Sequence, residues 1–204
     1  MRVFRFLIPI FFLASPTAAL AQGASPSPPQ SAEQMVPSPP SPADHQKRLD
    51  DLFSRLKREP DATKAEQIAN EIQAEWLQSG SATLDLLMQR SAQAASQKNI
   101  AAALDLLDQA IALFPDFPEA WNRRATIRYG EDRYDLSIAD VQATLKREPR
   151  HFGAMMGLAV MEEELGRNRS ALETYSRILA IYPAFKDAQD AALRLADELA
   201  GERA

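Results

Sequence analysis

Three prolines set a regular interval along the second half of the chain. Pro115, Pro149 and Pro183 follow one another at equal intervals of about 34 residues, and each closes a stretch with the pattern of two amphipathic helices. A helical hairpin of this length cannot bury its apolar face alone, so successive copies must stack. The spacing therefore predicts an all-α solenoid of antiparallel helix pairs, with an extended binding surface instead of an enclosed catalytic pocket.

Two columns of small residues support the repeat. If positions within each 34-residue unit are numbered as places and each proline stands at place 32, the units are 84–117, 118–151 and 152–185. Facing positions of two closely crossing helices must lack bulk so that the backbones can approach. Large apolar residues at places 21, 24 and 28 then form the stripe on which the next hairpin packs. The small columns are Ser91, Ala125 and Ala159 at place 8, and Ala103, Ser137 and Ala171 at place 20.

The pattern resembles the tetratricopeptide repeat family, whose units carry Trp-x-x-Leu-Gly-x-x-Tyr in the first helix and Ala, Phe, Ala and Pro in the second. The resemblance covers residues 84–185. Trp121 matches in a first helix, and Ala171-Leu-Glu-Thr-Tyr175 runs on to Pro183 in a second. It implies a tetratricopeptide superhelix of an exported bacterial type. The first helices depart from the pattern at Arg90 and Arg124 (place 7) and at Ala94, Arg128 and Glu162 (place 11).

Further helices are predicted on both sides of the repeats. Apolar spacing predicts a helix over Gln46–Leu56, and a capping box, Thr63-Lys-Ala-Glu66, predicts a second helix that stops at Gly80. Residues 44–81 thus form a divergent hairpin, either a degenerate fourth repeat or an N-terminal cap. Residues 186–204 are predicted to hold a helix that covers the last repeat, which brings the total to nine helices.

The N-terminal residues have the pattern of a secretory signal peptide. Within residues 1–21, Arg2 and Arg5 precede a short apolar run, and Ala19-Leu-Ala21 offers a cleavage site. The alternative is a retained membrane anchor, but the apolar run is shorter than the roughly 20 residues that a spanning helix needs. Residues 22–43 are rich in Pro and Ser and predict a disordered linker. We therefore expect a periplasmic protein of a Gram-negative bacterium that meets the membrane only transiently, through its signal peptide.

Charge and composition exclude several kinds of partner and chemistry. Removing residues 1–21 takes away two arginines and no acid, so the formal charge of −5 becomes −7. No basic cluster is present to bind nucleic acid or anionic lipid. The chain has no cysteine, and neither His45 nor His151 has a second histidine nearby in the sequence. His151 is expected to be exposed or packed in its loop, and the consecutive acids Glu162–Glu164 point in different directions on a helix. We expect no metal, no cofactor and no enzymatic activity.

The resemblance also implies a partner-binding face. In the family, first-helix side chains at places 2, 5, 9 and 12, and in some members place 6, line the concave surface. Some members hold a free carboxylate with basic and amide residues there, but Met88, Ala92 and Gly153 occupy three of those places, which disfavours that mode. The implied partner-binding residues are Met88, Asn122, Arg123, Thr126, Tyr129, Met156, Val160 and Glu163.

These observations favour a non-enzymatic adaptor or scaffold that binds a segment of another envelope protein, or a peptide, in the concave groove. An alternative is a structural module that associates with copies of itself, as a homo-oligomer. An enzyme or a glycan-processing factor is the least favoured reading, because no converging nucleophiles, bases or metal ligands are found.

Overall fold

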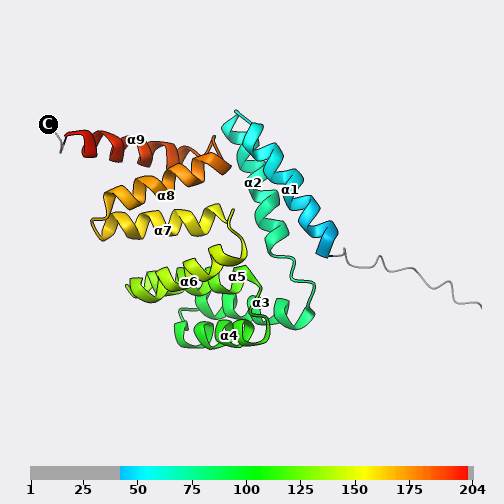
Figure 1. Ribbon diagram of the computed structural model, residues 1–204. Coiled ribbons are helices and arrows are strands. Elements are labelled where there is room, and N and C mark those ends of the chain that lie inside the picture. The colour runs from blue at the N-terminus through cyan, green and yellow to red at the C-terminus, as the bar shows by residue number, and fades with distance from the viewer. Residues whose placement is uncertain (1–41, 202–204) are drawn as a thin grey trace, which may run out of the picture. The chain divides into compact units, whose positions relative to one another are not determined.

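The computed structural model describes residues 42–201, which form nine α-helices with no strand among them (Figure 1). The predicted all-α solenoid is confirmed. Among these residues, no helix is long and apolar enough to cross a membrane. The helices are α1 (Pro42–Arg58), α2 (Ala62–Trp76), α3 (Ala82–Ser96), α4 (Ile100–Leu113), α5 (Pro118–Gly130), α6 (Tyr134–Arg147), α7 (Phe152–Glu164), α8 (Asn168–Ile181) and α9 (Lys186–Gly201).

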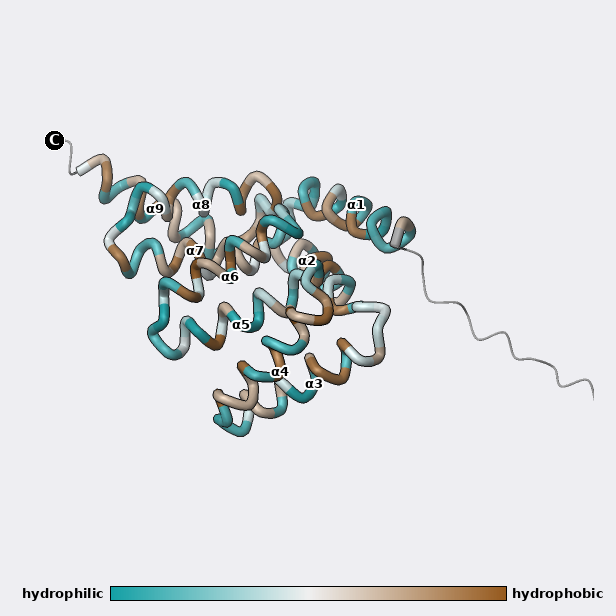
Figure 2. Tube along the Cα trace, turned by 60° about the horizontal axis from the view of Figure 1, so that its bottom comes forward, coloured by the Kyte–Doolittle hydropathy of each residue, from teal (hydrophilic) through white to brown (hydrophobic). Residues whose placement is uncertain are grey.

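The helices from α3 to α8 form three antiparallel pairs. Helices α4, α6 and α8 each end two residues before one of the regularly spaced prolines, where the amide ladder cannot continue. All six residues of the small columns are buried, and Ser137 Oγ donates a hydrogen bond of 2.8 Å to the carbonyl oxygen of Ala125 across one pair. Figure 2 shows apolar and polar segments alternating along these helices, as stacking requires.

In α5 the departure from the family pattern reflects an ion network that replaces apolar contacts. Asp140 on α6 is buried, and its two carboxylate oxygens pair with Arg124 Nη2 at 2.6 Å and with Arg128 Nη1 at 2.7 Å. Arg124 also pairs with the exposed Asp108 at 2.5 Å. The two arginines thus lie at places that the family fills with Leu and Tyr, and Asp140 supplies the opposite charge that their partial burial requires.

The N-terminal hairpin is placed differently from either reading of the sequence. Both a fourth repeat and an N-terminal cap would stack on α3 and α4, whereas α1 and α2 pack instead against the third pair, α7 and α8 (Figure 1). Arg150 Nη1 pairs with Asp50 Oδ1 at 2.7 Å, and its guanidinium lies 4.2 Å from the ring centroid of Phe53. The residues that join the hairpin to the third pair in one core cluster include Leu49, Phe53, Trp76, Phe152, Tyr175 and Tyr182.

The local details of this hairpin also correct the sequence analysis. Helix α2 begins at Ala62 because Asp61 is its N-cap: Asp61 Oδ1 accepts a hydrogen bond of 2.9 Å from the backbone N–H of Lys64. The predicted capping box at Thr63 is therefore wrong, since Thr63 lies inside the helix. The helix ends at Trp76, and Gly80, with a φ of +69°, belongs to the segment that leads to α3. Helix α1 begins at Pro42, inside the segment predicted as a linker.

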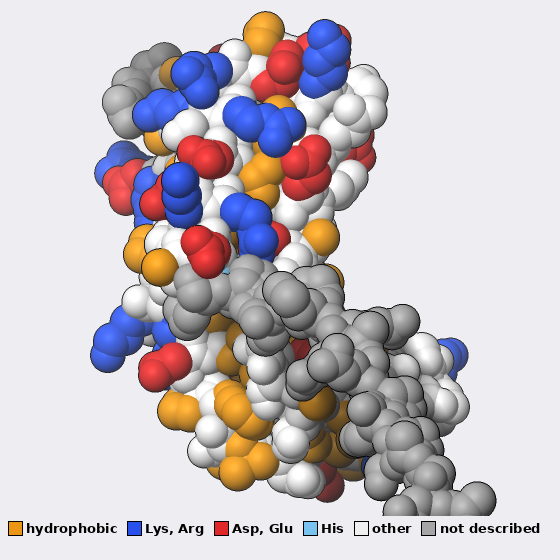
Figure 3. Space-filling model, turned by 90° about the vertical axis from the view of Figure 1, so that its right-hand side faces the viewer, with side chains coloured by type: hydrophobic (Ala, Val, Ile, Leu, Met, Phe, Trp, Pro, Cys, Tyr) orange, Lys and Arg blue, Asp and Glu red, His pale blue; other side chains and the backbone are white. Residues whose placement is uncertain are grey.

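The position of the hairpin leaves part of the first pair uncovered. Leu86 on α3 is 47% exposed and Leu113 on α4 is 62% exposed. Figure 3 shows hydrophobic side chains gathered on the lower part of the visible face, where α3 and α4 lie, and charged side chains over the upper part.

At the C-terminal end, α9 buries Ala188, Leu195 and Leu199 and packs on α8, as expected for a terminal covering helix. The predicted signal peptide and most of the predicted linker lie outside the described residues.

Candidate functional site

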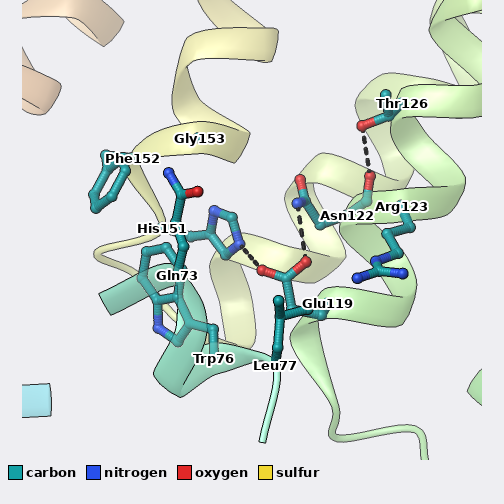
Figure 4. Close-up of a pocket in the computed structure, with 10 residues that line it drawn as sticks. All are labelled: Gln73, Trp76, Leu77, Glu119, Asn122, Arg123, Thr126, His151, Phe152 and Gly153. Atoms are coloured by element: carbon teal, nitrogen blue, oxygen red, sulfur yellow. Dashed lines mark hydrogen bonds and ion pairs between the residues drawn. The ribbon is translucent and has the colours of Figure 1, made fainter. Parts of the chain in front are cut away.

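A groove lies where α5 and α7 meet the end of α2. It has a volume of about 360 Å³ and a mixed polar and apolar lining (Figure 4). A smaller depression of about 130 Å³ continues from it between α5, α6 and α7, and the two share Asn122, Thr126 and Gly153. The residues that line the main groove are Gln73, Trp76 and Leu77 from α2 and its end, Glu119, Asn122, Arg123 and Thr126 from α5, and His151, Phe152 and Gly153 at the start of α7.

Four of the eight residues implied by the family resemblance lie together here. Asn122, Arg123 and Thr126 line the main groove, and Tyr129 lines its continuation. Asn122, Thr126 and Tyr129 are four and three residues apart on α5, so one helix face presents them. Thr126 is exposed, and its hydroxyl donates to the carbonyl oxygen of Asn122 at 3.1 Å. The hydroxyl oxygen of Thr126 can therefore still accept hydrogen bonds from a ligand.

The other four residues do not join this groove. Met88 is buried at 6% exposure in a core cluster with Leu84 and Leu107, so its side chain packs the interior. Met156 and Val160 are half-buried on α7, and Met156 packs against the cluster that holds the N-terminal hairpin. Glu163 is held at the α8 and α9 side: it accepts from Tyr175 Oη at 2.6 Å and pairs with Arg194 at 2.6 Å.

A buried histidine ties the three walls of the groove together. His151 is the N-cap of α7, and its Nδ1 accepts a hydrogen bond of 3.0 Å from the backbone N–H of Ala154. Its Nε2 lies 2.8 Å from Glu119 Oε1 on α5, and its ring stacks on Trp76 of α2 with centroids 4.2 Å apart. Because Nδ1 accepts, Nε2 is the ring nitrogen that donates to Glu119.

Glu119 is a buried carboxylate that the groove keeps ionised. Burial acts to raise the pKa of Glu119, but the hydrogen bond from His151, the bond of 3.3 Å from Asn122 Nδ2 and the charge of Arg123 outweigh it. The pKa of Glu119 is therefore held below its ordinary value. Both carboxylate oxygens are occupied by these two donors, so Glu119 shapes the groove but offers little to a ligand.

The acidic run at the end of α7 forms a set of bridges. Two of its carboxylates accept hydrogen bonds from α8: Glu162 from Thr174 Oγ1 at 2.8 Å, and Glu163 from Tyr175 Oη. Glu164 points the other way and accepts from Tyr129 Oη at 2.7 Å, a bond that raises the pKa of the Tyr129 phenol. The three carboxylates thus diverge as expected, but two of them brace the third pair instead of forming a plain solvated face.

Two glycines of α7 line the groove and its continuation, beside Ala154 and Met161. Gly153 and Gly157 are exposed and lie four residues apart, on the face that lines the two depressions. A Cβ added at Gly157 would meet no atom within 4 Å, and one at Gly153 would lie 3.5 Å from the His151 ring, an ordinary contact. Their backbones do not have a positive φ. The folded chain itself therefore gives no steric reason for glycine at either position.

Sequence reasoning missed the part of the groove formed by Trp76 and His151. His151 was expected to be exposed or packed in its loop. It is packed, at only 2% exposure, but the sequence did not predict that it contacts three helices. One pattern in the sequence points to its burial, because place 34 of the other two units holds Phe117 and Phe185.

Among the described residues, no group of three or more His, Cys, Asp or Glu side chains is arranged to hold a metal ion. The groove thus offers recognition chemistry: hydrogen bonds, one guanidinium and apolar contact.

Comparison with known proteins identifies the family. The profile of the tetratricopeptide repeat matches residues 84–127 and again residues 123–186. A TPR repeat-containing protein of Rhizobium etli is 51% identical over 156 residues, which covers 76% of each chain. The chain belongs to the tetratricopeptide repeat family. Members of known structure share its fold at low identity, and no enzymatic family is indicated by these matches.

Three solved tetratricopeptide structures illustrate the likeness. The first TPR of Spaghetti (RPAP3), bound to an HSP90 peptide, gives a TM-score of 0.54 at 16% identity and covers 58% of this chain and 94% of that one. The TPR2B domain of yeast Sti1, in a complex with Hsp70, gives 0.52 at 14% identity and covers 58% and 99%. MamA gives 0.52 at 15% identity and covers 76% and 82%. The tetratricopeptide fold supports a protein–protein interaction adaptor, with protein or peptide partners.

Proposed function

We propose that this tetratricopeptide protein is a non-enzymatic adaptor in the periplasm of a Gram-negative bacterium. It binds an extended segment of another envelope protein in the groove between α2, α5 and α7. The observation that carries this proposal is the continuity of the two depressions, which share Asn122, Thr126 and Gly153 and run along one face of α5. The HSP90 peptide complex of the Spaghetti domain and the Hsp70 complex of the Sti1 domain support the same use of the fold.

Site-specific photocrosslinking in intact cells tests the groove. A photoreactive amino acid at Thr126, which is exposed in the groove, is expected to give a crosslinked partner whose site maps to one short segment. The matched control is the same amino acid at Glu173, which is exposed on α8 and lines only a separate depression. The same partner segment crosslinked equally from both positions would show that the groove is not the binding site.

The location is tested separately. The pattern in residues 1–21 supports export, and the relative that is 51% identical comes from a bacterium, Rhizobium etli. Cell fractionation with N-terminal sequencing is expected to find the protein in the periplasmic fraction, beginning at Gln22. Recovery in the cytoplasm with residues 1–21 intact would contradict the proposed location, and recovery in the membrane with those residues would indicate the retained anchor.

A second candidate function, self-association, is favoured by the exposed Leu86 and Leu113 on the uncovered first pair. Light scattering across concentration distinguishes it from the adaptor. A dimer that the double change Leu86→Lys and Leu113→Lys turns into a monomer would support self-association, and a monomer at every concentration would remove it.

A further inference from the structure

The groove contains a guanidinium with donors to spare. Arg123 is half-buried, and the hydrogen bond given by its side chain is a long one, 3.4 Å from Nη1 to the carbonyl oxygen of Met88. Among the described residues, no carboxylate oxygen lies within ion-pair distance of it. A guanidinium has five N–H donors in a fixed planar fork, so most of those of Arg123 remain available.

The surrounding charges are already satisfied. Arg124, the next residue on α5, gives its donors to Asp140 and Asp108. The nearest acid in the groove, Glu119, receives hydrogen bonds on both oxygens from His151 and Asn122. Arg123 therefore keeps donors for the anionic group of a ligand, whereas Glu119 is only 7% exposed and offers little surface to a cationic group. Partial burial strengthens such a pairing relative to one in open water.

The spacing of the two glycines on α7 fits an extended peptide chain. Gly153 and Gly157 lie about 6 Å apart along the axis of α7, close to the roughly 6.6 Å that two residues of an extended chain span. Because neither glycine carries a side chain, a peptide backbone can approach α7 more closely there than at other residues.

We propose that the partner segment is an acidic, extended peptide: its backbone lies along Gly153 and Gly157, and one of its carboxylates pairs with Arg123. This inference rests on the proposed function of the groove and names the chemistry that the groove selects. The planar guanidinium can pair with both oxygens of a side-chain carboxylate, and this geometry selects an acid over the amide of the same shape.

Binding of matched synthetic peptides to the full chain tests the acidic preference. The probes are labelled, end-blocked peptides of about nine residues, identical except that the two central positions are Glu, Gln or Lys. We expect the Glu peptide to bind about tenfold more tightly than the Gln peptide, with the Lys peptide weakest. A further Gln peptide with a free C-terminus separates a side-chain carboxylate from a chain-end carboxylate. Raising the salt from about 50 to about 300 mM should weaken the Glu peptide selectively.

Variants of the arginine complete the test. Arg123→Gln is expected to reduce the preference for Glu over Gln to less than about twofold, and Arg123→Lys to restore part of it. The control is Arg177→Gln, because Arg177 is exposed on α8, outside the groove. An unchanged preference in Arg123→Gln overturns the proposal, as do equal binding of all peptides and no binding of any. Tighter binding of the free-C-terminus peptide than of the Glu peptide overturns the assignment to a side chain.

The failure of this inference can be distinguished from failure of the groove itself. If Thr126 crosslinks one partner segment that has no acid near the crosslinked residue, the groove remains the binding site and the acidic preference is wrong. If Thr126 and Glu173 crosslink the same segment equally, the proposed function of the groove is wrong as well.

Discussion

Nε2 of His151, at the start of α7, lies 2.8 Å from Oε1 of Glu119, in the first turn of α5, and both side chains are buried. The same imidazole caps α7 through Nδ1 and stacks on Trp76 of the N-terminal hairpin. One side chain thus connects three parts of the chain that lie far apart in sequence. The shape of the groove depends on this connection, because α2, α5 and α7 form its walls.

Replacing His151 with Ala should destabilise the fold by about 2–4 kcal/mol. The change removes an N-cap, worth about 1 kcal/mol, and takes one of the two hydrogen-bond donors from a buried carboxylate. His151→Asn can still cap α7 but cannot reach Glu119, so it should recover about 1 kcal/mol. Urea unfolding followed by circular dichroism measures both variants. Equal losses for Ala and Asn would show that capping contributes nothing.

The depressed pKa of Glu119 predicts acid sensitivity. A carboxyl group whose folded pKa lies below its unfolded value of about 4.5 contributes stability that is fully present above that value. This stability is lost as the pH falls through the folded pKa, because the folded state then binds the proton as well. Glu119→Gln should therefore flatten the fall in urea midpoint below about pH 4.5. A slope as steep in the variant as in the original chain would assign the acid sensitivity to other carboxyl groups.

The contacts of Trp76 predict a selective loss of hairpin docking. Trp76 is 3% exposed and packs on His151, Phe152 and Phe53, so Trp76→Ala should cost about 3–5 kcal/mol. Hydrogen exchange should rise over α1 and α2 and much less over α3 to α6, since few contacts join the hairpin to those helices. Asp50→Ala, which removes only the exposed partner of Arg150, should cost much less. Uniform exchange over all helices in Trp76→Ala would mean that the hairpin unfolds with the repeats as one unit.

The sequence predicted the features that depend on local periodicity. The prolines and the two small columns predicted the helix pairs, because chain termination and close helix crossing act within one unit. The placement of Asn122, Thr126 and Tyr129 on one face follows from their spacing on a single helix. The docking of α1 and α2 was not predictable in this way, since it depends on pairs such as Asp50 with Arg150, which are 100 residues apart and belong to no repeat. Met88 was misplaced because its burial depends on the α3 and α4 core.

The glycines of α7 predict two effects of opposite sign. Gly157→Ala should stabilise the fold by about 0.5–1 kcal/mol, because alanine favours the helix and its Cβ meets no neighbouring atom. The same methyl group should weaken binding of the Glu peptide, because it occupies the space that the peptide backbone needs. The control is Ala180→Gly at an exposed site on α8, which should lower stability and leave binding unchanged. Measurement of the melting temperature and peptide affinity of each variant checks both effects. Tighter or unchanged binding in Gly157→Ala would remove the glycines from the proposed contact.

The ion network at Asp140 predicts a contrast between a single and a triple variant. Asp140→Asn leaves the half-buried guanidinium of Arg128 without its carboxylate and should cost about 3–5 kcal/mol. The triple change Arg124→Leu, Arg128→Tyr and Asp140→Leu replaces the whole network by apolar contacts, with the family's own residues at places 7 and 11. Removing paired charges together avoids an uncompensated charge, so the triple variant should be at least as stable as the original chain.

This contrast also separates the network from the groove. Arg123 is not a partner of Asp140, so the triple variant should keep its preference for the Glu peptide over the Gln peptide. Thermal unfolding and peptide binding measured on the two variants provide the test. A cost below about 1 kcal/mol for Asp140→Asn would show that solvent compensates the arginines. A loss of the acidic preference in the triple variant would mean that the network also positions Arg123.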